Sequence, residues 1–140
     1  MSGWSRKEFS EKGGVPDRKV LFYTEQGMFP DLRLDVGRGK ARVYTNTELR
    51  DLRLIIELTK SGLPLAKIRD LISYVHSIRD EWMPKGKLIK SPFFVSWDMV
   101  NGKPQGFYVS EHQTKGAIEK IESPLMLQIN LTAIFSGLEE

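Results

Sequence analysis

The first 27 residues constrain the fold most strongly, because they encode two short helices with a tight turn between them. Ser5 and Glu8 form a capping box, which begins a helix by satisfying its first backbone N–H groups. Gly13-Gly14 ends this helix, and Pro16-Asp17 begins a second one that Gly27 ends. A turn of about four residues between two helices is helix-turn-helix spacing. In the second helix Val20, Tyr23 and Thr24 share one face, whereas Arg18, Lys19 and Phe22 point elsewhere.

A basic hairpin is predicted directly after this pair of helices. Residues 32–44 suit two short strands around 36–40, where glycines permit the positive φ of a hairpin tip. No acidic residue occurs from Val36 to Tyr44, and the segment carries Arg38, Lys40 and Arg42. A basic, glycine-rich hairpin beside a helix-turn-helix is typical of the wing of a winged helix.

Two further amphipathic helices follow the hairpin. Thr45 and Glu48 form a second capping box, and apolar residues then recur at helical spacing. Pro64 begins a fourth helix, whose apolar stripe extends to Trp82 and stops before Pro84. These stripes predict a buried core.

From Ser91 onward the apolar residues alternate as they do in strands. Asn101-Gly102 is a hairpin turn signal, and Pro104 marks an edge or the start of a strand. We therefore expect strands over 93–99, 105–110 and 125–129, a short helix or loop over 116–122, and a last helix over 131–138 capped by Asn130.

Charge divides the chain into a basic front and an acidic back. Residues 1–90 hold 18 Lys+Arg and 12 Asp+Glu, a net of +6, and residues 91–140 hold 3 and 6, a net of −3; the sum is the chain's +3. A basic front half suits a polyanionic partner, although a well-solvated surface gives the same count. No apolar run approaches the ~18 residues of a membrane span, and no leader is evident. We expect a cytoplasmic protein.

Catalytic and metal-binding chemistry has little support in the sequence. Cysteine is absent, and His76 and His112 have no partner at suggestive spacing. The segment 37–39 lacks the third glycine of a dinucleotide fingerprint. We expect no cofactor, no metal and no enzymatic activity.

Five segments in order together resemble the MerR family of bacterial transcription regulators. They span about residues 4–75 and match the family's first helix at 4–15, its recognition helix at 17–29, its wing at 37–45, and its third and fourth helices at 49–52 and 61–68. The resemblance implies an α+β fold, with a four-helix winged helix-turn-helix domain over 1–84. A small β-rich accessory domain for effector binding or dimerisation would then occupy 91–140.

The resemblance also implies partners and roles. Members are dimers on pseudo-palindromic operators in double-stranded DNA, and activating members distort promoters so that RNA polymerase can engage them. Carried over by position, Arg18, Lys19, Phe22 and Tyr23 lie on the DNA face, Arg42 and Tyr44 anchor the wing to phosphate, and Arg38 and Lys40 occupy the wing tip. The chain departs from the pattern at Leu21 and Thr24. It also departs at Pro84-Lys85-Gly86, which interrupts the region where a long dimerisation helix is usual; only residues 131–140 could begin such a helix.

Physical chemistry assigns these residues distinct tasks, each with a plainer alternative. Arg18 suits bidentate reading of guanine or a phosphate contact, and Lys19 suits phosphate. Phe22 suits a thymine methyl or simple packing, and Tyr23 suits the core with its hydroxyl at the rim. About four phosphate contacts per subunit predict a log–log salt slope near −4.

The aromatic residues of the back half have two interpretations. Phe93, Trp97, Phe107 and Tyr108 could line a pocket for a hydrophobic effector or close a small β core, and a sheet this small favours the core. Two other functions stay open for the whole chain: a recombination or architectural DNA-binding factor, and a protein- or ligand-binding module that no longer binds DNA.

Overall fold

The computed structural model describes residues 3–32, 42–89, 92–98, 104–108 and 126–138. Contacts divide the chain into two compact units, Met1–Ser73 and Tyr74–Glu139. The first holds α1 (Arg6–Gly13), α2 (Asp17–Glu25), α3 (Asn46–Lys60) and most of α4 (Leu65–Ser77). The second holds α5 (Arg79–Trp82), η1 (Pro84–Gly86), β1 (Phe93–Asp98), β2 (Pro104–Tyr108), β3 (Met126–Asn130) and α7 (Leu131–Ile134). None of the described helices is long and apolar enough to cross a membrane.

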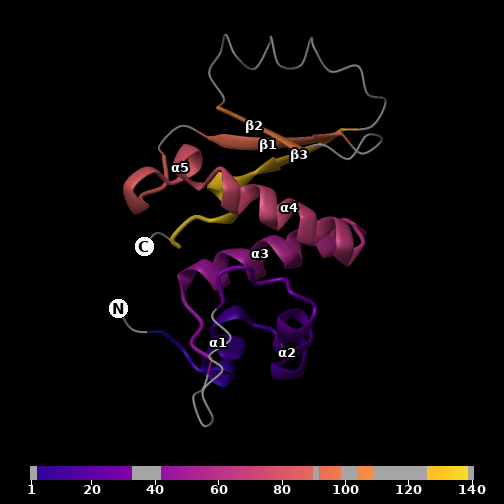
Figure 1. The fold of residues 1–140 in the computed structure, drawn as a ribbon, viewed down its shortest axis with the longest axis vertical. Helices are drawn as coiled ribbons and strands as arrows, with labels where there is room; N and C mark the ends of the chain where they lie inside the picture. The colour runs from indigo at the N-terminus through magenta and orange to yellow at the C-terminus, as the bar shows by residue number, and fades with distance from the viewer. Residues whose placement is uncertain (1–2, 33–41, 90–91, 99–103, 109–125, 139–140) are drawn as a thin grey trace. The chain divides into compact units, whose positions relative to one another are not determined.

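The first unit begins with the two predicted helices, which lie on the same side of α3 (Figure 1). The Ser5 hydroxyl accepts from the Glu8 N–H and the Glu8 carboxylate accepts from the Ser5 N–H, both at 3.2 Å, so the capping box is confirmed. Gly14 ends α1 with a left-handed φ of 69°. The second capping box, at Thr45 and Glu48, begins α3 as predicted.

An aromatic cluster forms the core where α1 and α2 meet the chain after residue 41. The Phe9 and Tyr44 rings stack with centroids 4.6 Å apart, and Phe29 packs edge-on against both. Phe9 and Tyr44 are fully buried, as are Val20 and Leu52. The end of α2 is held separately, because Arg69 of α4 donates to the Gln26 carbonyl oxygen at 2.9 Å.

The second unit contains a three-stranded antiparallel sheet in the order β2-β1-β3. Phe94 pairs with Phe107 on one side and with Asn130 on the other, so β1 is central. Pro104 begins the edge strand β2, where a residue without an N–H is tolerated. The Phe93 N–H donates to the Thr132 hydroxyl at 2.9 Å and ties β1 to α7. The helices of the first unit and the sheet of the second confirm the predicted mixed α+β class.

The fourth helix differs from its prediction, because it breaks at Ile78 instead of continuing to Trp82. In a continuous helix the Val75 carbonyl would accept from the N–H of residue 79. Here it accepts from the indole Nε1 of Trp82 at 2.9 Å, and the Trp82 ring packs against Phe135. The indole of Trp82 thus binds the Val75 carbonyl near the point where α4 ends, and α5 follows as a separate turn.

The last helix is also shorter than predicted. Asn130 caps it as expected, with its side-chain oxygen accepting from the Ala133 N–H at 3.0 Å, but the helix ends at Ile134. The strand expected at 125–129 is observed one residue later. The turn at Asn101-Gly102, the segment 116–122 and most of the predicted wing lie outside the described residues.

A matched pair of phenylalanines tests the position of the core. Phe9→Ala removes a fully buried ring, so we expect a loss of about 3–5 kcal/mol in the free energy of unfolding. Phe22→Ala changes a side chain that is 44% exposed, so we expect a loss below about 1 kcal/mol. Urea unfolding of both variants measures the difference, and equal losses would contradict the packing described.

The α1 capping box also gives a pH prediction. Hydrogen bonds from the Ser5 backbone and side chain lower the pKa of Glu8 below its ordinary 4.5. A lowered folded-state pKa stabilises the fold above the unfolded pKa, and this contribution is lost as the pH falls through the folded value. We expect an NMR titration to place the Glu8 midpoint below 4.5. Ser5→Ala should move it partly back, and an unchanged midpoint in that variant would contradict the box.

Candidate nucleic-acid interface

Helix α2 presents one exposed face that carries three of the predicted DNA-binding residues. Arg18, Lys19 and Phe22 are exposed, while Val20 and Tyr23 are buried against the rest of the unit. Within the described residues, neither Arg18 nor Lys19 has an ion-pair partner. The sequence prediction of which residues face inward is therefore confirmed, and the outward face is free to meet a ligand.

Tyr44 lies in the core, whereas its predicted role as a phosphate anchor calls for an exposed side chain. It is 0% exposed, and its hydroxyl lies 3.0 Å from the Thr24 hydroxyl. Thr24 has a single hydroxyl proton and donates it to the Val20 carbonyl at 2.8 Å, so Tyr44 is the donor to Thr24. The hydroxyl of Tyr44 thus ties the end of the predicted wing to the C-terminal end of α2.

The backbone of Tyr44 makes a second tie, to the start of the chain. Its N–H donates to the Trp4 carbonyl at 2.8 Å and its carbonyl accepts from the Trp4 N–H at 2.7 Å. This bridge brings the residues that precede α1 beside the residues that follow the predicted wing. Arg42, two residues before Tyr44, is partly buried in this region. Arg38 and Lys40 lie outside the described residues.

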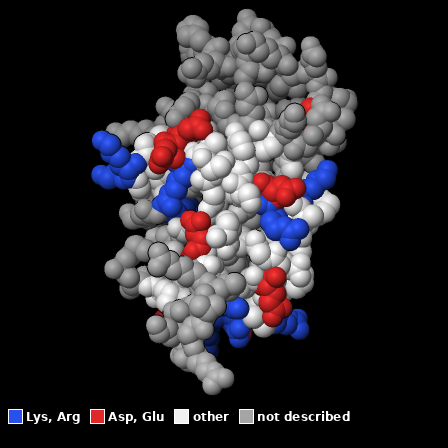
Figure 2. Space-filling view, viewed as in Figure 1, with Lys and Arg blue, Asp and Glu red and all other residues white. Residues whose placement is uncertain are grey.

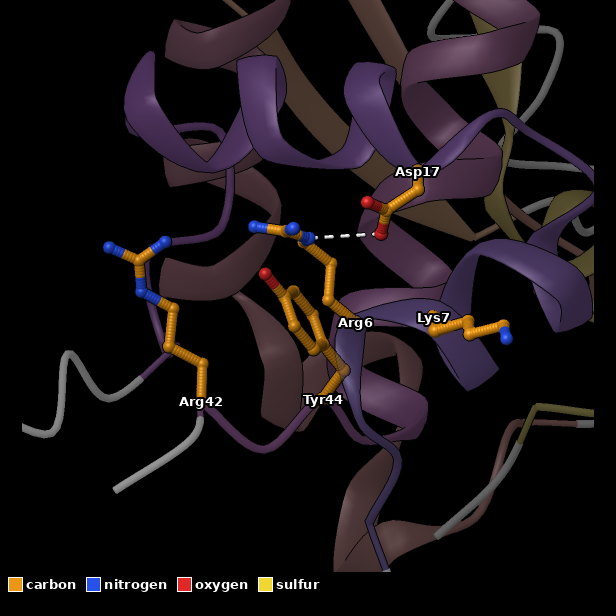
Figure 3. A pocket seen from close by; sticks show the side chains of 5 residues that line it. All are labelled: Arg6, Lys7, Asp17, Arg42 and Tyr44. Carbon is orange, nitrogen blue, oxygen red and sulfur yellow. Dashed lines mark hydrogen bonds and ion pairs between the residues drawn. The ribbon is translucent and has the colours of Figure 1, made fainter. Parts of the chain in front are cut away.

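A pocket of about 600 Å³ opens where these segments meet (Figure 3). The Arg6 Nε donates to the Asp17 carboxylate at 2.9 Å, which joins the first residue of α1 to the first residue of α2. This ion pair raises the pKa of Arg6, chiefly through the hydrogen bond to Asp17. The pocket is lined by Arg6, Lys7, Asp17, Arg42 and Tyr44.

Arg6, Lys7 and Asp17 were not among the site residues that the sequence predicted. One signal was present: Arg6 and Lys7 lie beside Glu8 in the first turn of α1, where the helix dipole favours acidic residues. Two cations at the positive end of a helix repel the helix dipole, and a nearby anion offsets this repulsion. Figure 2 shows basic and acidic side chains together over the part of the surface where α1 and α2 lie.

The structure describes the burial of two of the four predicted aromatic residues of the second unit, and the backbone pairing of the other two. Phe93 and Trp97 are buried in β1, and the backbones of Phe107 and Tyr108 pair with β1 from β2. The indole Nε1 of Trp97 is buried with no hydrogen-bond partner among the described residues. Effector binding stays a prediction.

The described residues hold no cluster of three His, Asp or Glu side chains suited to a metal ion.

Comparison with known proteins identifies the helix-turn-helix part of the chain. Residues 5–75, half of the chain, match the family described as MerR HTH family regulatory protein. A comparison with curated proteins gives no match. The matched span contains the capping box of α1, the exposed face of α2 and both sides of the pocket. The chain therefore belongs to the MerR family of helix-turn-helix transcription regulators, and residues 5–75 are its DNA-binding domain.

Proposed function

We propose that this protein regulates transcription from pseudo-palindromic operators at promoters, with the helix over 17–26 in the major groove and the predicted wing over 36–44 on the adjacent backbone. One observation carries the proposal: Arg18, Lys19 and Phe22 are exposed on α2, while Val20 and Tyr23 are buried against the rest of the unit. A helix held in this way can enter the groove without rearranging the core behind it.

The side chains on this face divide the work of binding. Arg18 has the fork of donors that matches guanine, a contact that discriminates against the wrong base by about 1–3 kcal/mol. Lys19 is a compact charge suited to phosphate. Phe22 offers the apolar surface that a thymine methyl requires. Tyr23 is buried beneath this face, and its ring contacts the ring of Phe22.

The proposal extends to a homodimer that acts together with RNA polymerase. A two-fold protein mirrors a pseudo-palindromic operator, and one α2 helix would then read each half-site. Residues 1–84 form the DNA-binding domain in this proposal. Residues 91–140 form an accessory domain for effector binding or dimerisation.

Selection of bound fragments from a genome tests the proposed place of action. We expect the recovered fragments to come from promoters and to share an inverted repeat. Sedimentation of the complex is expected to give two chains per site. Recovery of recombination attachment sites in place of promoters would contradict the regulatory proposal, and failure to retain any duplex at low salt would contradict DNA binding by this chain.

Two arginine substitutions test how the face reads DNA. We expect Arg18→Ala to reduce the preference for a selected operator over a random duplex by about 10–100-fold, because the base contact is lost. Arg42→Ala should weaken binding to both duplexes by the same factor, because phosphate contacts carry no sequence information. Fluorescence anisotropy with both duplexes measures the two ratios. A pair of variants that both bind like the wild-type chain would overturn this assignment.

A further inference from the structure

We propose that the pocket lined by Arg6 and Arg42 binds one phosphate of the DNA backbone, and that Asp17 positions Arg6 for this contact. The proposal rests on the DNA-binding function proposed above. It adds a contact made by α1, which the sequence had not indicated as part of the interface.

The side chains that line the pocket carry more positive than negative charge. Arg6 and Arg42 contribute two positive charges and Asp17 one negative charge, and Lys7 lines the pocket but extends away from Arg42. Glu25 acts on Arg6 electrostatically but is not among the lining residues. Arg42 has no ion-pair partner within the described part of the chain. Like charges held together in one pocket repel, so binding of an anion there is favoured.

The donors are arranged to suit a phosphate. Asp17 binds Arg6 through Nε alone, so this ion pair leaves both Nη groups of Arg6 available. Figure 3 shows the guanidinium end of Arg6 extending toward the side where Arg42 lies, whereas Lys7 extends the opposite way. Guanidinium groups bind phosphate oxygens through parallel N–H donors, which a lysine cannot reproduce. Arg6 and Arg42 are therefore the pair assigned to the phosphate.

The elements that build the pocket explain why DNA is the source of the phosphate. Arg6 and Asp17 begin the two helices of the helix-turn-helix, and Arg42 directly follows the predicted wing tip. A phosphate in this pocket would lie between the part of the duplex that α2 reads and the part that the wing contacts. Asp17 opposes the phosphate electrostatically, so its benefit is to hold Arg6 in place.

The salt dependence of binding tests the contact. We expect Arg6→Gln to reduce the magnitude of the log–log salt slope by about 0.9 per subunit, equally on a selected operator and on a random duplex. Affinity at low salt should fall on the order of tenfold. Lys12→Gln is the matched control, because it removes the same charge from the exposed far end of α1, outside the pocket. It should keep a slope close to that of the wild-type chain.

A neutral methylphosphonate placed at successive positions of the duplex locates the contact. We expect the methylphosphonate to weaken binding of the wild-type chain at one position in each half-site. At that position it should not weaken binding of Arg6→Gln. Asp17→Asn should bind no more weakly than wild type overall, because it also removes a negative charge, but it should lose this positional sensitivity. Thermal unfolding confirms that each variant is folded.

The outcomes separate this contact from the proposed function. If wild type binds DNA and Arg18→Ala loses sequence preference while Arg6→Gln keeps the wild-type slope, the pocket is not a phosphate site and the proposed function stands. The phosphate contact is likewise overturned if Arg6→Gln and Asp17→Asn lose equal thermal stability without changing the slope, since their ion pair then serves only the fold. If wild type retains no duplex, both the contact and the proposed function are overturned.

Discussion

The buried ring of Tyr44 is the interaction on which the geometry of the interface depends. Its face stacks on Phe9 of α1, its hydroxyl donates to Thr24 of α2, and its backbone pairs with Trp4. One residue thus joins the chain before α1, both helices of the helix-turn-helix and the chain after the predicted wing. Because these ties are buried or made by backbone atoms, water and salt do not weaken them as they weaken surface ion pairs.

The charged side chains of this region lie outside the buried cluster. The Arg6–Asp17 pair shows the distinction, because its side chains are 41% and 46% exposed. An exposed pair of this type contributes about 0–1 kcal/mol to stability, much less than the loss of a buried aromatic ring. Its main effect is to restrict the orientation of Arg6. Stability and charge placement therefore rest on different residues in the same small region.

The sequence predicted the elements whose signals are local. Both capping boxes, the glycine that ends α1 and the cap at Asn130 depend on residues within about four positions of one another, and all are observed. The inward and outward faces of α2 follow from helical spacing in the same way. Local signals fail where a distant side chain replaces a backbone partner, as the indole of Trp82 does at Val75.

The candidate site was predicted in part for the same reason. Arg18, Lys19 and Phe22 can be assigned to one face because they belong to one helix. The pocket could not be assigned, because Arg42 lies beside Arg6 and Asp17 only when the Trp4–Tyr44 bridge brings the chain that contains Arg42 next to the start of α1. Spacing along the chain carries no information on such a convergence. The sequence also suggested a surface role for Tyr44, because this residue ends a predicted basic hairpin. In the structure its ring is buried against Phe9.

The pocket proposed to bind phosphate lies beside the buried tyrosine, which helps to hold its arginines in place. The contacts of Tyr44 with Phe9 and Thr24 fix the chain that carries Arg42 against the helix that carries Arg6 and the helix that carries Asp17. A charged pair that is already oriented loses less conformational freedom when it binds, so more of the electrostatic attraction is kept as affinity. In the complex proposed above, the aromatic core contributes to DNA binding without touching DNA, because it holds two arginines from distant parts of the sequence at one pocket.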